Sequence, residues 1–320
     1  MSRTFFRRLL VPAAAAATLL GGFGAAVLAA RDVPGDGFFR PWSATPDASA
    51  ADRYHYSLTV RVRPLLFWIT RKGVGSGRIT RADGQGSTRL FELLIGSDPA
   101  RTPMHINRWG YVAEVHRDEA VAILGLMTEA NEQTVEEAGR TVNGRPRAEH
   151  RFKAIRATVA EGTASAQVVR ISLAEDFTLH DLPAVLGQLP EGGAATARVQ
   201  LPDGVRPGFL GAVADLVRET IEAARSSNAG PRTPSATYVW DRGLYDLTCS
   251  SRPFRAPKDE AIRCSGCLES EFRIRNRARG DKTTFRLAYA TDGPLAGIPV
   301  RIVYRPRWWF EAELTLAEAR

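Results

Sequence analysis

The sequence predicts a mostly β (α+β) protein: a strongly curved antiparallel sheet or incomplete barrel with two or three inserted helices. Three observations predict this fold class. Apolar and polar residues alternate over many short segments, which is the pattern of half-buried strands. Turn-forming Gly, Pro and Asp residues separate these segments, as they do in antiparallel sheets. No fixed-period repeat occurs, which argues against a propeller or solenoid.

The first 30 residues have the layout of a secretion signal. They open with three basic residues, Arg3, Arg7 and Arg8. Residues 9–30 then contain no charge, and a positive start followed by an apolar run is typical of a secretory signal peptide. A run of this length also suffices to cross a bilayer, so an uncleaved anchor is the alternative. Pro12 favours cleavage because it breaks a helix. We predict a periplasmic or otherwise exported protein, membrane-anchored if the signal is not cleaved.

The remainder divides into a linker and one domain. Residues 31–52 are rich in Pro, Gly, Ala, Ser and Asp, as flexible linkers are. Residues 53–320 are numerous enough for one large core, and we predict a single curved β domain there. No second apolar run in this part approaches the length of a membrane span.

The first half of the domain is predicted to be mainly strands. A two-residue period over 54–63 predicts a half-buried strand. The continuous apolar run 65–70 predicts a strand buried on both faces. The glycine-rich segment Gly73–Gly77 is similar to a phosphate loop, but strand-like residues follow it where a helix should begin. We therefore predict a bulge or bend at a sheet corner. Further strands are predicted over 89–95, 106–116, 152–159 and 165–173.

Three segments have helical spacing. Residues 118–138 place Val121, Leu124 and Met127 on one side, with acidic residues mostly on the other. Residues 181–189 predict a short helix. The clearest helix, 207–224, has an apolar stripe with spacings of three and four residues. The stripe consists of Phe209, Val213, Leu216, Val217 and Ile221. We expect this helix to lie across the concave face of the sheet.

The C-terminal part returns to a two-residue period. Apolar residues alternate with charged or small polar ones over four segments, 272–275, 284–289, 298–305 and 310–316. Turn residues separate the segments, so a run of antiparallel strands is predicted. The last two would form a closing hairpin.

Charge limits the classes of partner. The formal net charge is +8, of which the first 30 residues contribute three arginines and no acid, leaving +5 for the rest. Basic residues are spread out, without the dense patch of a nucleic-acid-binding protein, so we predict no nucleic-acid partner. A net charge of +5 is compatible with anionic lipid or cell-wall polymer.

Motifs for catalysis are absent from the sequence. No nucleophile elbow and no zinc-binding histidine pair occur. The adjacent His180 and Asp181 resemble a base and its orienting acid, but a surface histidine is the interpretation we favour. We therefore assign no catalytic residue, cofactor or metal site, and we favour a binding protein over an enzyme.

Three cysteines, Cys249, Cys264 and Cys267, lie in the last quarter of the chain. In an oxidising compartment two of them would pair, and the sequence leaves all three pairings open. The Cys264–Cys267 spacing is also found in redox motifs and zinc half-sites. Neither context is present, so we favour a structural disulfide that ties a loop between two strands.

Two segments place arginine next to aromatic residues in the sequence. The residues concerned are Arg108, Trp109, Arg305, Arg307 and Trp308. A guanidinium stacks on tryptophan and grips carboxylate or phosphate with paired donors. We hypothesise that both segments line one end of a ligand cavity and hold an anionic head group. The alternative is that the tryptophans pack in the core and the arginines cover sheet edges.

This organisation resembles the periplasmic β half-barrel proteins of the lipoprotein-carrier type and their uncharacterised relatives. The resemblance is architectural and rests most on the segment Gly73–Ile79 and the closing hairpin Ile298–Leu316. It implies an incomplete barrel that wraps a helical lid around an apolar cavity for acyl chains. It assigns no functional residue to this chain.

The function we predict is that of an exported envelope protein binding an apolar or amphiphilic, lipid-like ligand on the concave face of its sheet. Membrane association through residues 9–30 is part of this prediction. One alternative is an envelope hydrolase with a site assembled from scattered residues. Another is a structural partner protein, which would expose an apolar patch.

Overall fold

The computed structural model describes residues 51–63, 67–84, 87–102, 106–118, 120–128, 150–173, 177–190, 197–226, 233–240, 243–255, 264 and 266–319. The predicted signal, 1–30, and the linker up to residue 50 lie outside these ranges. Within them, no helix is long and apolar enough to cross a membrane.

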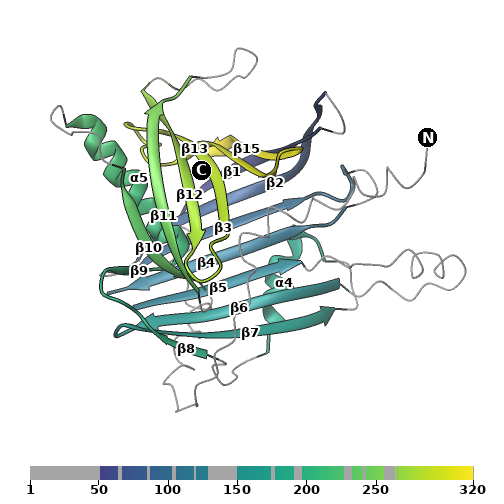
Figure 1. Cartoon of the computed structure of the whole chain (residues 1–320). Helices are drawn as coiled ribbons and strands as arrows, with labels where there is room; N and C mark the ends of the chain where they lie inside the picture. Colours follow the sequence, from purple (N-terminus) through teal and green to yellow (C-terminus); the bar gives the residue numbers. More distant parts are fainter. Residues whose placement is uncertain are drawn as a thin grey trace, which may run out of the picture.

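The described strands form one 15-stranded sheet that curves strongly (Figure 1). The strands are β1 (Asp52–Val62), β2 (Ile69–Asp83), β3 (Arg89–Ser97), β4 (Trp109–Arg117), β5 (Ala120–Thr128), β6 (His150–Ala160), β7 (Thr163–Leu173), β8 (Ala197–Gln200), β9 (Val205–Pro207), β10 (Ser235–Trp240), β11 (Gly243–Pro253), β12 (Cys267–Asn276), β13 (Lys282–Ala290), β14 (Pro299–Arg307) and β15 (Phe310–Ala319). The predicted class, a mostly β protein with a curved and unclosed antiparallel sheet, is confirmed.

Two meanders make up this sheet. The strand order is β8-β7-β6-β5-β4-β3-β2-β1-β15-β14-β13-β12-β11-β10-β9, so each half follows chain order and the halves join where β1 pairs with β15. Described pairings are antiparallel except that of β9 with β10. The two edge strands, β8 and β9, are consecutive in the chain and only residues 201–204 separate them. The sheet is therefore open between β8 and β9 in the described residues.

Helix α5 (Phe209–Arg225) fills the concave side of the sheet. Its residues Leu216, Val217 and Ile221 are buried, and Phe209 and Val213 pack beside them in the largest described core cluster. Both halves of the sheet contribute to that cluster. Because an apolar stripe needs an apolar partner, the predicted helix and its placement on the concave face are confirmed.

A short helix covers the opposite face of the first half. The 3-10 helix η5 (Leu179–Asp181) leads into α4 (Leu182–Gly187), as predicted for 181–189. Its residues Leu182 and Val185 pack against Leu126 and Phe152 in a second core cluster. Strands β4, β5 and β6 are thus buried on both faces, by the α5 cluster on one side and by the α4 cluster on the other.

The predicted helix at 118–138 is wrong where the structure describes it. Residues 120–128 form β5, and 129–149 lie outside the described residues. Val121 and Ile123 face the α5 side, whereas Leu124 and Leu126 face the α4 side. A strand buried on both faces is apolar at every position, so its sequence also matches helical spacing.

The glycine segment in β2 forms a bulge, as predicted. Leu58 lies opposite Gly75 and Val60 opposite Arg71, so β2 holds extra residues at this point. Gly73 has a φ of +64°, which a side chain would strain. The segment continues as strand, which excludes the phosphate-loop alternative. The predicted strands over 89–95, 106–116, 152–159 and 165–173, and those of the C-terminal part, are also confirmed.

The prediction of a doubly buried strand over 65–70 is wrong for the part that is described. Phe67, Trp68 and Ile69 are 60%, 38% and 44% exposed, and β2 begins only at Ile69. These apolar residues lie at the end of the β1–β2 hairpin, where no described strand or helix covers them. Sequence alone did not distinguish an apolar hairpin end from a core strand.

Because α5 packs against both halves of the sheet, we predict that truncating one of its buried side chains lowers the stability of the protein strongly. Leu216→Ala should lower the free energy of unfolding by about 2–5 kcal/mol, because Leu216 is fully buried and leaves a cavity. Chemical denaturation measures the change. The matched variant Arg218→Ala, on the exposed side of the same helix, should change stability by less than about 0.5 kcal/mol. Equal effects would contradict the placement of α5.

Candidate functional site

The two arginine–aromatic segments predicted to share one site lie apart. Trp109 begins β4, and three strands, β3, β2 and β1, stand between β4 and β15. Its side chain is 2% exposed, packs on Phe152 with ring centroids 5.2 Å apart, and donates to the Phe177 carbonyl at 3.1 Å. Arg108 is partly buried, and desolvation lowers its guanidinium pKa. The alternative interpretation, tryptophan in the core, therefore applies to Trp109.

The second segment is exposed and meets a different tryptophan. Trp308 lies between β14 and β15 and is 64% exposed. The Arg305 guanidinium stands over the Trp68 ring, 5.1 Å from its centroid, and donates to the Trp308 carbonyl at 2.5 Å. Arg307 is also exposed. The structure therefore places Arg305 beside Trp68 and Trp308, and not beside Trp109. The role of these residues in ligand binding stays a prediction.

Backbone pairing explains why these residues meet. Val62, the last residue of β1, pairs with Ile69 on one side and Phe310 on the other. The amide of Arg63 donates to the Trp309 carbonyl at 2.7 Å. The ends of the β1–β2 and β14–β15 hairpins are therefore joined side by side. We call the surface formed by Phe67, Trp68, Ile69, Arg305, Arg307 and Trp308 the hairpin-end patch.

The patch concentrates the exposed large hydrophobic side chains. Among the described residues, four large apolar side chains are exposed, and all four belong to the hairpin-end patch. They are Phe67, Trp68, Ile69 and Trp308. Their neighbours Trp309 and Phe310 turn inward and pack with the core cluster of β1 and β15. The inward residues fix the hairpin, which leaves the outward ones available for contact.

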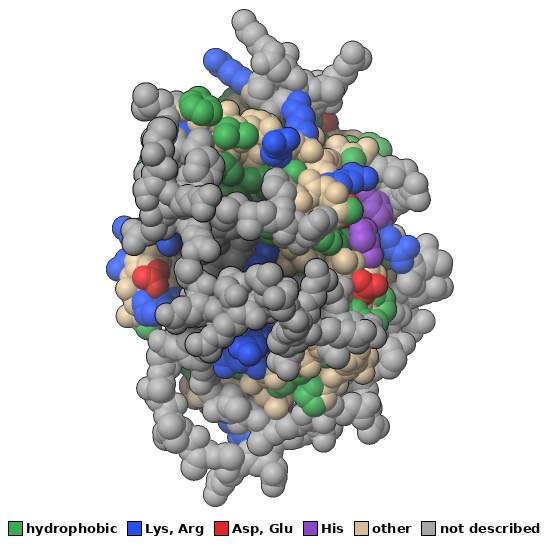
Figure 2. Space-filling view, turned by 90° about the vertical axis from the view of Figure 1, so that its right-hand side faces the viewer, with side chains coloured by type: hydrophobic (Ala, Val, Ile, Leu, Met, Phe, Trp, Pro, Cys, Tyr) green, Lys and Arg blue, Asp and Glu red, His purple; other side chains and the backbone are tan. Residues whose placement is uncertain are grey.

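Its charge is positive. Arg71, Lys72, Arg305 and Arg307 are exposed around the apolar side chains. The chain contains no acidic residue from 53 to 82 or from 300 to 310. The acid that follows, Glu311, is buried and binds Arg61 at 2.9 Å. The upper part of the face in Figure 2, where the β1–β2 end lies in Figure 1, shows hydrophobic side chains beside Lys and Arg.

A buried carboxylate that the sequence analysis did not single out fixes α5. Glu114, on β4, is 0% exposed and accepts hydrogen bonds from the amides of Leu210 and Gly211 at 2.8 and 2.9 Å. These amides belong to the first turn of α5, where the helix dipole attracts negative charge. Nε2 of His116 lies 3.2 Å from the same carboxylate. The sequence did contain a sign of this contact, because an acid and a histidine lie two residues apart on an otherwise apolar strand.

Two glycines allow this close contact. A Cβ on Gly208 would lie 2.4 Å from a Glu114 oxygen, and one on Gly211 would lie 2.5 Å from the His116 ring. Gly208 also has a φ of +82°. The Glu114–His116 pair is therefore enclosed by the helix it holds, and its role is structural.

The structure joins Cys264 and Cys267 in a disulfide, with Cα atoms 5.7 Å apart. Cys249 remains a buried free thiol, and burial raises its pKa. Among the described residues, no three His, Cys, Asp or Glu side chains gather to hold a metal. His180 is exposed, and Asp181 accepts from the amide and hydroxyl of Thr178 as part of a capping box.

Comparison with known proteins gives one structural similarity. No family model and no curated protein matches the chain. A solved structure of a β-barrel-like protein of the domain of unknown function DUF1849, from Brucella abortus, is similar over 85% of this chain and 97% of its own. Its sequence identity is 12% and the TM-score is 0.40.

The contact between Glu114 and α5 predicts a stability loss on neutralisation. Glu114→Gln should lower the free energy of unfolding by about 1–3 kcal/mol, because an amide NH2 group would face a helix N–H donor in a buried place. Denaturant titration measures it. Glu222→Gln, on the exposed side of α5, is the matched control and should be nearly neutral. If Glu114→Gln leaves the free energy of unfolding unchanged, the carboxylate does not hold α5 in place.

Proposed function

We propose that the protein is an exported, non-enzymatic envelope protein that binds lipid by docking the hairpin-end patch on an anionic membrane surface. One observation carries the proposal: the exposed large apolar side chains of the described residues gather in one place, beside arginines and a lysine and without acids.

Membrane interfaces favour this composition. Tryptophan concentrates at the level of lipid head groups, because its ring is apolar and its N–H is polar. An anionic leaflet attracts each nearby Lys or Arg by about 1 kcal/mol. Withdrawing an exposed Phe or Trp side chain from water adds about 1.5–3 kcal/mol each. Two inserted aromatics with four flanking cations therefore suffice for reversible docking.

The concave face is the less supported place for a lipid. In the described residues it packs against α5 and buried aromatics, including Phe272 and Tyr289. A lipid-like ligand there would have to displace the helix, whereas the patch already presents its apolar atoms to the outside.

Export rests on the N-terminal sequence. The uncharged segment 9–30 after three arginines has the layout of a signal. We expect residues 1–30 to be absent from the protein in the envelope fraction. N-terminal sequencing checks this: a first residue near Arg31 supports cleavage, and intact Met1 would mean that the segment stays as an anchor.

A flotation experiment tests the docking surface. It uses protein lacking residues 1–30, because that apolar segment would bind vesicles by itself, and the described fold starts at residue 51. The protein should float with vesicles of phosphatidylglycerol and phosphatidylcholine, and less with phosphatidylcholine alone. Phe67→Ser with Trp308→Ser should lower the partition coefficient at least tenfold, since both side chains are more than half exposed and leave the core intact.

The controls separate charge at the patch from charge elsewhere. Arg305→Gln with Arg307→Gln should weaken binding to anionic vesicles, and added salt should weaken it as well. Arg218→Gln with Arg279→Gln removes the same charge at a distance from the patch and should have little effect. Equal loss in both pairs, or full binding by the aromatic variant, would refute the proposal. Self-association that the aromatic variant abolishes, without vesicle binding, would instead favour the structural-partner alternative.

A further inference from the structure

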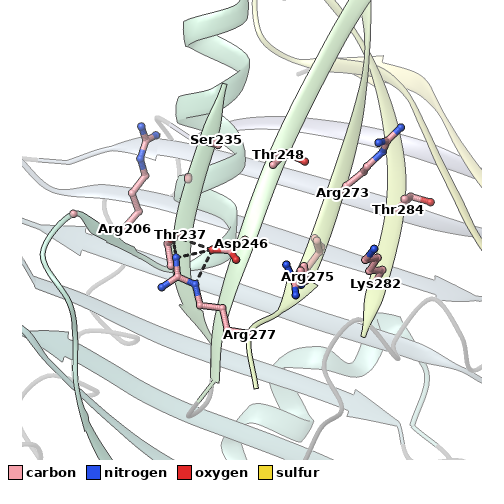
Figure 3. A pocket seen from close by; sticks show the side chains of 13 residues that line it. Arg206, Ser235, Thr237, Asp246, Thr248, Arg273, Arg275, Arg277, Lys282 and Thr284 are labelled. Carbon is pink, nitrogen blue, oxygen red and sulfur yellow. Dashed lines mark hydrogen bonds and ion pairs between the residues drawn. The ribbon is translucent and has the colours of Figure 1, made fainter. Parts of the chain in front are cut away.

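A second surface, on different strands, has the features of an anion site. A groove of about 680 Å³ lies on the outer face of β9–β13, with α5 on the other side of these strands (Figure 3). Its charged lining comprises five basic residues and one acid, Arg206, Arg273, Arg275, Arg277, Lys282 and Asp246. The rest of the lining includes the hydroxyls of Ser235, Thr237, Thr248 and Thr284.

Strand register places these side chains in two rows. The first row runs across four strands through Thr237, Asp246, Arg275 and Lys282. The second runs through Ser235, Thr248, Arg273 and Thr284. Because residues two apart on a strand share a face, both rows point the same way. Figure 3 shows Arg275 and Lys282 next to each other on β12 and β13.

Most of the charges in the groove already have a partner. Asp246 is held by Arg277, with an oxygen–nitrogen distance of 2.7 Å, and accepts from Thr237. Arg273 pairs with Glu271 at 2.8 Å. Arg206 pairs with two acids of α5, Asp215 and Glu219.

Unlike the other charged residues of the groove, Arg275 and Lys282 have no acidic partner among the described residues. They are direct cross-strand partners, and neither makes an ion pair with another described residue. Like charges directly opposite each other destabilise a sheet. The acid that could relieve them, Asp246, lies opposite Arg275 but is engaged by Arg277. The fold therefore keeps two adjacent cations unneutralised, beside the hydroxyls of Thr248 and Thr284.

We propose that this groove binds a phosphate-bearing anion, gripped by Arg275 and Lys282 and hydrogen-bonded by Thr284 and Thr248. The arginine fork matches two phosphate oxygens, and the ammonium supplies a point charge beside it. The groove has the size of a small-molecule site, so the ligand is a phosphorylated molecule larger than a single ion. The inference goes beyond membrane docking, since the groove shares no residue with the hairpin-end patch.

Two sources supply this chemistry, a free phosphorylated metabolite or a lipid head group. Glycerol 3-phosphate is the probe for the first. Monomeric dihexanoyl phosphatidylglycerol, which is short enough to stay out of vesicles, is the probe for the second. Calorimetric titration uses the protein purified from the envelope fraction, in the processed form that accumulates there. Binding of either probe at the groove supports the site, and their relative affinities identify the source.

Arg275→Gln with Lys282→Gln should weaken binding of whichever probe binds by at least tenfold, because each change removes a charge-assisted hydrogen bond. Arg279→Gln, on the β12–β13 turn outside the groove, is the matched control and should bind within twofold of wild type. If neither probe binds wild type, or if the double variant binds as wild type does, the proposal is wrong.

Thermal unfolding gives an independent readout. Without ligand, the double variant should unfold at the same or a higher temperature than wild type, since it loses a like-charge pair. The bound probe should raise the unfolding temperature of wild type and of Arg279→Gln, but not of the double variant. A double variant that unfolds at a lower temperature would show that the two cations stabilise the sheet, which contradicts the site.

Discussion

The burial of α5 between the two halves of the sheet is the interaction on which the rest of this structure depends. A 15-stranded sheet that curves without closing has an apolar concave face that must be covered, and the apolar side of the amphipathic helix α5 covers it. The Glu114 carboxylate takes up the first free amides of α5, so the helix begins at a fixed point on β4. Gly208 and Gly211 leave room for that contact.

The sequence predicted correctly those strands that have one solvent-exposed face and one buried face. Strands such as β12 and β13 alternate polar and apolar residues, because their outer face carries Arg273 and Lys282 while α5 covers the inner one. The same logic failed for β5, which is covered on both faces and lost its two-residue period. The pairing of β1 with β15 links residues some 250 positions apart, and no local pattern encodes it.

The sequence indicated which residue types could form a site, but it did not indicate which of them lie together. Adjacency in the sequence pointed to Arg305, Arg307 and Trp308, and the structure shows all three exposed at one hairpin end. Their aromatic partner comes from the β1–β2 hairpin, which only the long-range strand order brings near. The groove was also only partly predictable from the sequence. The two-residue period places Arg273 and Arg275 on one face of their strand, but only the strand register places Lys282 opposite Arg275.

Exposed aromatics on a β protein invite the explanation that they protect or extend an open sheet edge. That explanation does not apply here, because the edges are β8 and β9, which have four and three residues, and β9 ends in a proline. Short edges with proline resist further pairing. Phe67, Trp68 and Trp308 lie instead at hairpin ends in the middle of the strand order, where turn residues would serve folding equally well. Within the described fold, the Arg305 guanidinium over the Trp68 ring is an exposed contact and offsets little of the cost of keeping these side chains in water, which supports the proposal that they contact a membrane.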